Sequence, residues 1–359
     1  MVIFALITSR IQFEEAQSLA GCIASDLNLI CGCCGQISEV KSSQDYHGDR
    51  APKPTLRRQY MLFRKLNKGF RELKSNEMKF TLILFQDVGR IENLVIQVAR
   101  KHSGKIVLIP DGIIIDVENV YLEKYPKYIL HYLISKLFNL KIRRKRKWFE
   151  SKPDIVVLSP LQKIQSDKLV QIKSFTIETP RREALLQNSR QLTSRGGMLI
   201  CGTPLGELDK SRNIWAYETE KYINAAKKIG KIAGASTFIY RPHPGQLNDM
   251  SDYNLREVPV SLRPLSQDLR ENEFVVTYPS TLVFEALSIG RDVYIYLPKK
   301  DKERMFSVNI ELIETVHEDF WKCIDNSLTK QNHEELCHLE NSHEAWRSLL
   351  NSLESKQIS

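Results

Sequence analysis

The repeated alternation of short apolar runs with helical stretches is the feature that most constrains the fold of this chain. In the first half, the apolar runs lie at Val2 to Thr8, Phe80 to Gln86, Ile106 to Pro110 and Ile155 to Ser159. Strands that alternate with helices are typical of parallel sheets, because a parallel connection needs a crossover. We therefore predict an α/β protein.

The second half of the chain repeats this alternation. Its apolar runs lie at Met198 to Cys201, Thr237 to Arg241, Phe274 to Thr277 and Val293 to Leu297. Residues 162–195 between the halves are mostly polar and irregular, and 359 residues are enough for two cores. We predict domains at residues 1–160 and 195–330, and a C-terminal helix within 331–359 that packs back on one of them.

Composition excludes fibrous, disordered and disulfide-rich classes of protein. Apolar residues make up 42% of the chain and charged residues 26%, close to the globular average. The apolar N-terminus is interrupted by Arg10 and has no basic leader, so we interpret it as a buried strand. Seven cysteines, an odd number, fit a reducing cytoplasm. The group at Cys31 to Cys34 lacks the paired spacing of a zinc site, and no metal is expected.

A histidine between two prolines follows the predicted strand Thr237 to Arg241. The phrase reads Arg241-Pro242-His243-Pro244, and the carboxyl ends of strands are where α/β sheets bind ligands. Proline restricts the backbone on either side of His243, whose imidazole could bind a phosphate or transfer a proton. A hydrogen-bonded, partly buried histidine without such a role is the alternative.

Two hydroxyl residues stand at the next predicted junction of strand and helix. The hydroxyls of Ser280 and Thr281, with the free amides of the first helical turn, would face an anion. Glu285 lies on the same helical face as Thr281. Ordinary helix capping explains the same residue types.

Two further strand ends carry candidate residues. Asp111, followed by Gly112, comes after the strand that ends at Pro110, and could take a proton from an acceptor hydroxyl or simply form a turn. Gly202 and Thr203 could form a loop that closes on a ligand, or a plain connection. The sequence has no G-x-G-x-x-G, no P-loop and no Asp-x-Asp pair, so chemistry without a cofactor is expected.

Together the three motifs resemble those of the bacterial sialyltransferases and polysialyltransferases of the GT-B type, which make capsules and lipooligosaccharides. His243-Pro244 matches the H-P motif, Ser280-Thr281 matches the S-S/T motif, and Asp111-Gly112 matches the end of the D/E-D/E-G motif. The segment from Glu285 to Arg291 is similar to the Glu-Ala-Leu…Gly segment of GT-B donor domains.

The resemblance implies two Rossmann-like domains that face a central cleft. It implies an inverting, metal-independent glycosyltransferase that moves sialic acid, or a related keto-sugar, from a CMP-activated donor to a cell-surface glycan or glycolipid. His243 would be the general acid at the phosphate and Asp111 the base. The expected donor-binding residues are Gly202, Thr203, Arg241, Pro244, Ser280, Thr281 and Glu285.

Three other functions remain open at this point. A related capsule or teichoic-acid transferase would use CDP-glycerol or an activated Kdo donor with the same histidine. A UDP-sugar 2-epimerase of the same fold would need more carboxylates in the cleft than the sequence suggests. A non-catalytic protein would bind lipid or nucleic acid through its basic run.

That run, residues 141–147, holds six of the cations in a chain of net charge +9. It follows an apolar, helix-like stretch at Tyr128 to Leu140 and leads into Trp148, a combination that suits an anionic membrane surface or an anionic glycan. No nucleic-acid-binding motif accompanies it, so nucleic acid is not expected. The predicted contact residues are Arg143, Arg144, Lys145, Arg146, Lys147 and Trp148, which would place a cytoplasmic enzyme on the inner face of the membrane.

Overall fold

The chain divides into two compact units in the computed structural model. The structure describes residues 2–22, 27–32, 36–39, 56–87, 90–110, 151–159, 173–189, 191–193, 195–202, 212–243, 258–278, 280–297, 310–315, 319–325 and 342–354. Unit 1 comprises Met1–Arg181 and Leu339–Ser359, and unit 2 comprises Arg182–His338. Each unit is built around its own mainly parallel sheet, as the α/β prediction required.

The sheet of unit 1 has seven strands in the order β3-β2-β1-β4-β5-β6-β7. Only β3 runs antiparallel to its neighbour. Its strands are β1 (Val2–Ile7), β2 (Leu27–Cys31), β3 (Gln36–Glu39), β4 (Phe80–Leu84), β5 (Lys105–Leu108), β6 (Ile155–Leu158) and β7 (Ser174–Thr176). The central strands are buried on both faces, which is why they appear in the sequence as continuous apolar runs.

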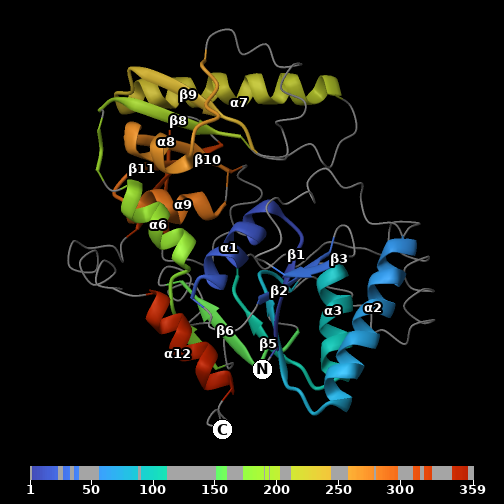
Figure 1. The fold of residues 1–359 in the computed structure, drawn as a ribbon. Coiled ribbons are helices and arrows are strands. Elements are labelled where there is room, and N and C mark those ends of the chain that lie inside the picture. The colour runs from blue at the N-terminus through green and yellow to red at the C-terminus, as the bar shows by residue number, and fades with distance from the viewer. Residues whose placement is uncertain are drawn as a thin grey trace. The chain divides into compact units, whose positions relative to one another are not determined.

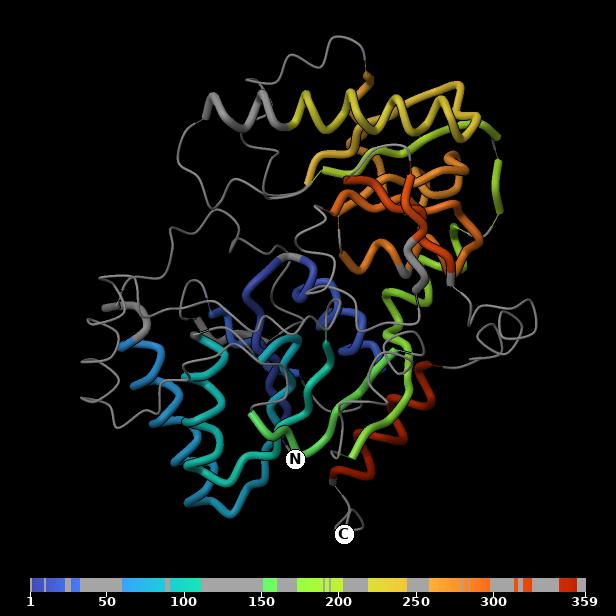
Figure 2. The backbone as a smooth tube through the Cα atoms, turned by 180° about the vertical axis from the view of Figure 1, so that it is seen from behind, coloured from blue at the N-terminus to red at the C-terminus, as the bar shows by residue number. Residues whose placement is uncertain are grey.

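Helices cover both faces of this sheet (Figure 1). On one face, α2 (Leu56–Ser75) buries leucines and a phenylalanine, and α3 (Arg90–Lys101) buries isoleucines, valines and an alanine, against β1, β4 and β5. On the other face, α1 (Arg10–Ala20) packs with α12 (Ser342–Glu354), the helix that Figure 2 shows in red. Trp346 of α12 is fully buried and its indole donates to the carbonyl of Glu178 at 2.8 Å.

The sheet of unit 2 has six strands in the order β12-β13-β11-β10-β8-β9. The strands are β8 (Gly197–Cys201), β9 (Thr237–Arg241), β10 (Phe274–Thr277), β11 (Asp292–Tyr296), β12 (Ile310–Glu314) and β13 (Phe320–Asp325). The first four are parallel, and β13 and β12 extend the sheet in antiparallel fashion. Figure 1 shows α7 (Arg212–Ala233) on one face, with α8 (Leu265–Glu271) and α9 (Thr281–Ser288) on the other.

Both sheets reverse their strand order at one point. In unit 1 the chain passes from β1 to β2 on one side and from β4 to β5 on the other, so the reversal lies between β1 and β4. In unit 2 the same reversal lies between β8 and β10. The helices that follow the two strands at such a point lie on opposite faces of the sheet, which opens a crevice at the carboxyl edge.

Two segments differ from the sequence prediction. The stretch 162–195 was predicted to be irregular, but it contains β7 and α6 (Pro180–Ser189), which spans the boundary between the units. The edge strand β3 lies outside the runs predicted as strands, because an edge position needs little apolar content. The helix expected at 128–140 and the basic run at 141–148 lie outside the described residues. Within the described residues, no helix has the length and apolar character to cross a membrane.

Two glycines, one in α7 and one in α2, differ in how closely their helices are packed against neighbouring side chains. A Cβ on Gly230 of α7 would come within 2.6 Å of both Met198 Sδ and Phe238 Cε1, whereas a Cβ on Gly69 of α2 would meet nothing within 4 Å. We expect Gly230→Ala to destabilise the protein by about 1–3 kcal/mol through overpacking. Gly69→Ala should stabilise it by about 0.5–1 kcal/mol, because alanine loses less backbone entropy. Urea unfolding of both variants measures this, and equal shifts would contradict the packing of α7 on β8 and β9.

Candidate functional site

The carboxyl ends of β8, β9 and β10 lie at one edge of the unit 2 sheet. The three strands are parallel, and the register pairs Cys201 with Arg241 and Ile200 with Val276. Three of the predicted site residues therefore lie at this edge: Gly202 directly after β8, His243 after β9 and Ser280 after β10. The other predicted residues Asp111, Thr203 and Pro244 lie outside the described part of the chain.

Ser280 occupies the N-cap of α9 without capping it. Its backbone is extended, as at an N-cap, but its side chain makes no capping hydrogen bond. The hydroxyl instead lies 3.3 Å from the hydroxyl of Thr277 at the end of β10. In ordinary capping the serine oxygen would accept a first-turn amide hydrogen. The first turn of α9 therefore lacks the usual serine cap, although the amide of Val283 donates to the carbonyl of Ser280 at 3.1 Å. The amides and partial positive charge at a helix N-terminus favour an anion.

In unit 1, the serine at the N-cap of the helix after the first strand does cap that helix. Ser9 at the N-cap of α1 accepts a hydrogen bond from the amide of Gln12 at 3.3 Å. The Gln12 side chain, only 2% exposed, accepts hydrogen bonds from the amide and the hydroxyl of Thr8, at 2.8 and 3.0 Å. Thr8 directly follows β1, as Gly202 directly follows β8.

A polar network continues from Thr8 across the unit 1 crevice. The Gln86 amide, which follows β4, donates to Glu92 Oε1 at 2.6 Å and lies 3.2 Å from the Thr8 hydroxyl. The Thr8 hydroxyl also lies 3.2 Å from the same oxygen of Glu92, which is 4% exposed. These side chains thus bond to one another at the carboxyl edge of the unit 1 sheet. Sequence reasoning missed this network, because only the strand order makes the ends of β1 and β4 neighbours.

A tyrosine joins the two strands at the reversal point of unit 2. The Tyr222 hydroxyl of α7 lies 3.0 Å from the carbonyl of Cys201 and 3.3 Å from that of Val276. Burial raises the pKa of Tyr222 well above its usual value, so the hydroxyl keeps its proton and remains a donor. Burial also raises the pKa of the Cys201 thiol to about 12, which makes this cysteine a poor nucleophile.

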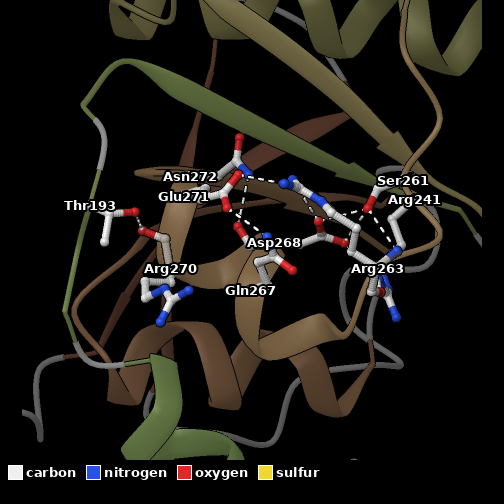
Figure 3. Close-up of polar contacts among 9 residues, drawn as sticks. All are labelled: Thr193, Arg241, Ser261, Arg263, Gln267, Asp268, Arg270, Glu271 and Asn272. Atoms are coloured by element: carbon white, nitrogen blue, oxygen red, sulfur yellow. Dashed lines mark hydrogen bonds and ion pairs between the residues drawn. The ribbon is translucent and has the colours of Figure 1, made fainter.

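Arg241, at the end of β9, is held by a buried carboxylate (Figure 3). Asp268 of α8 is fully buried, and its Oδ2 accepts from Arg241 Nη1 at 2.6 Å. Its Oδ1 accepts from Arg263 Nη2 at 3.1 Å and from the Ser261 hydroxyl at 2.7 Å. Glu271 Oε2 accepts a hydrogen bond from Arg263 Nη1 at 2.7 Å. Two carboxylates, Asp268 and Glu271, therefore balance the charges of the two guanidinium groups.

This arrangement orients the guanidinium of Arg241. Its bonds to other described residues, namely to Asp268 and to the carbonyl of Arg263, both use Nη1. The Nε–Nη2 edge is the geometry that binds phosphate or carboxylate with two parallel hydrogen bonds. The Arg241 side chain is 27% exposed, so part of it is in contact with solvent while Nη1 stays bonded to Asp268.

Glu285 occupies a different environment from the other predicted donor-binding residues. Its carboxylate lies 3.8 Å from Arg182 Nε, and both side chains are only 9% exposed. The pair links α9 to α6 within unit 2. Because both charges are buried, replacing either partner alone would leave an uncompensated buried charge.

Two comparisons of the chain with known proteins found no match. No protein-family model matches the chain, and a search of curated proteins finds no match. Within the described residues, no group of three or more His, Cys, Asp or Glu side chains is placed to hold a metal ion.

The two N-cap serines make a matched pair for experiment. Ser9→Ala removes a capping bond and should lower the free energy of unfolding by about 1 kcal/mol. Ser280→Ala removes no such bond and should change it by less than about 0.5 kcal/mol. Chemical denaturation of both variants measures the difference. A cost for Ser280→Ala as large as that for Ser9→Ala would show that Ser280 caps α9 in solution.

Asp268 should be among the most sensitive positions of unit 2. Asp268→Asn keeps the shape but removes the charge that faces Arg241 and Arg263, and breaking a buried pair costs about 3 kcal/mol or more. Glu271→Gln, on the same helix and 31% exposed, should cost less than about 1 kcal/mol. Urea unfolding compares them, and equal costs would exclude Asp268 as the anchor of the cluster.

Proposed function

We propose that this chain is an inverting glycosyltransferase of the GT-B type, which moves sialic acid or a related keto-sugar from a CMP-activated donor to a cell-surface glycan or glycolipid. The observation that carries the proposal is the uncapped N-terminus of α9 at the strand reversal of unit 2. Arg241 is the last residue of β9 and His243 follows it, at the same edge of the sheet. Three groups that suit a phosphate therefore lie at the ends of neighbouring strands.

The difference between the two crevices supports unit 2 as the donor domain. In unit 1 the position after the first strand is Thr8, whose hydrogen bonds to Gln12 and Glu92 fill the space. In unit 2 the equivalent position is Gly202, which has no side chain. A nucleotide needs room at the end of this strand for its phosphate to approach the backbone.

The proposed chemistry assigns a role to each donor-side group. The phosphate of the donor lies on the first turn of α9, with the hydroxyls of Ser280 and Thr281 on its oxygens and Arg241 alongside. The bond between the anomeric carbon and the phosphate oxygen breaks, and its electron pair leaves with CMP. His243 gives a proton to the departing phosphate and Arg241 stabilises its charge.

The acceptor is activated from the first domain in this proposal. Asp111 removes the proton of an acceptor hydroxyl, whose oxygen attacks the anomeric carbon on the face opposite the leaving group. That displacement inverts the anomeric configuration. Contacts of residues 143–148 with anionic lipid would hold the enzyme at the inner face of the membrane, where lipid-linked acceptors are found.

Turnover of CMP-sialic acid in the presence of EDTA tests the reaction. The wild type should release CMP, and His243→Ala should lower kcat by about 100-fold or more, the usual loss on removing a general acid. His343→Ala is the matched control, because His343 is an exposed residue of α12 in the other unit. Far-UV circular dichroism of both variants checks that they are folded.

The contrary outcomes separate the remaining functions. Turnover of CDP-glycerol but not of CMP-sialic acid would show that the donor is different and would leave the proposed site unchanged. Interconversion of UDP-N-acetylglucosamine and its 2-epimer without an acceptor would identify an epimerase. Equal activity of His243→Ala and the wild type would remove His243 from the chemistry altogether.

A further inference from the structure

The outer face of α2 carries a dense group of cations. The helix packs its apolar side on the unit 1 sheet, where Leu62, Leu66 and Phe70 are about fully buried, each 1% exposed. The opposite side is exposed and basic. We call this surface the α2 basic face, and define it as Arg64, Lys65, Lys68, Arg71 and Lys74.

Little negative charge offsets the α2 basic face. Glu72 is the one acidic residue within Leu56–Ser75. It pairs with Lys68 at 3.8 Å, but the two side chains are 61% and 81% exposed, so the pair is weak in water. The remaining cations of the face therefore produce a positive local potential.

A histidine beneath α2 responds to this potential. His102, at the end of α3, lies with its Nε2 2.9 Å from Asn67 Oδ1 of α2. Burial lowers the pKa of His102, and the positive charges of Lys101, Lys74 and Arg71 lower it further. Lys101, itself exposed, thus adds to the same field from the adjacent helix.

The N-terminal part of the face adds apolar side chains to the cations. Tyr60 is 40% exposed and Met61 is 49% exposed, one turn before Arg64 and Lys65. Arg64 lies over the ring of Tyr60, 5.9 Å from its centroid. Cations beside an aromatic residue and a methionine at one exposed surface suit the headgroup region of an anionic bilayer, where cations meet anionic lipid and amphipathic side chains lie at the interface.

We propose that the α2 basic face docks the protein on the surface of an anionic lipid bilayer. The five cations lie within Arg64 to Lys74, about 15 Å of helix, and spread over its outer half, so a flat array of headgroups can contact several of them at once. Tyr60 and Met61 reach the level of the headgroups. This surface is separate from the basic run at 141–147, and the inference does not depend on which reaction the protein catalyses.

Lipid fits the face better than nucleic acid does. A bilayer interface buries exposed apolar side chains such as Met61, whereas affinity for nucleic acid comes mainly from cations at phosphates. The exposed positions from Arg64 to Lys74 are Lys, Arg and Glu, which suit the phosphates of either partner. Apolar contact is therefore the property that separates the two partners.

Co-sedimentation with vesicles tests the proposal on the full-length protein. The vesicles contain either phosphatidylcholine alone or phosphatidylcholine with 30% phosphatidylglycerol. The wild type should bind only the anionic vesicles, and 0.5 M NaCl should release it. The triple variant Lys68→Gln, Arg71→Gln, Lys74→Gln should bind about 100-fold more weakly, since each cation at an anionic leaflet contributes roughly five-fold.

A second set of exposed lysines provides the matched control. Lys221→Gln, Lys228→Gln, Lys231→Gln makes the same change in net charge on α7 of unit 2. This variant should bind vesicles within about two-fold of the wild type. Thermal unfolding of both triple variants checks that their stability is unchanged, as expected for exposed positions.

Met61→Gln identifies the partner. It should weaken vesicle binding several-fold while leaving binding to a single-stranded RNA oligonucleotide unchanged. Vesicle binding by the α2 triple variant equal to that of the wild type would overturn the proposal, as would its loss only when residues 143–147 are replaced. Tighter binding of the wild type to RNA than to anionic vesicles, insensitive to Met61→Gln, would assign the face to nucleic acid instead.

Discussion

The reversal of strand order between β8 and β10 is the constraint on which the candidate site depends. Parallel strands place all their carboxyl ends at one edge, and the reversal sends the following helices to opposite faces. Gly202, His243 and Ser280 are far apart in sequence, yet this topology alone makes their strands neighbours. Tyr222 secures the arrangement, because its hydroxyl meets a carbonyl of each strand at the reversal.

The two units solve the same geometric problem in opposite ways. In unit 1 the crevice is closed by hydrogen bonds among Thr8, Gln12, Gln86 and Glu92, and the N-cap of α1 is satisfied internally. In unit 2 a glycine follows the first strand and the N-cap serine turns to Thr277. Polar groups at the carboxyl edge of a sheet can bond to one another or to a ligand. The two N-cap serines, Ser9 and Ser280, therefore differ in their hydrogen-bond partners.

The sequence predicted the strands that are buried on both faces, because continuous apolar runs such as Ile155 to Leu158 have no other simple explanation. It missed α2, whose apolar residues are separated by seven cations, and the antiparallel strands β12 and β13 at the sheet edge. The motif positions Gly202, His243 and Ser280 were found from strand ends. Asp268 was not, because an aspartate in the short helix Leu265–Glu271 looks like a surface residue until the fold buries it beside Arg241. Whether Ser280 caps its helix is likewise decided by one side-chain torsion, which sequence does not encode.

The docking of α12 has a consequence for how the protein forms during synthesis. Unit 2 is continuous in sequence, so all its residues have been synthesised once His338 is added. Unit 1 is completed later, because the fully buried tryptophan of its core cluster is residue 346. Until then the ribosome carries a nascent first unit with an apolar face uncovered, and chaperones that shield such faces have a defined interval in which to act.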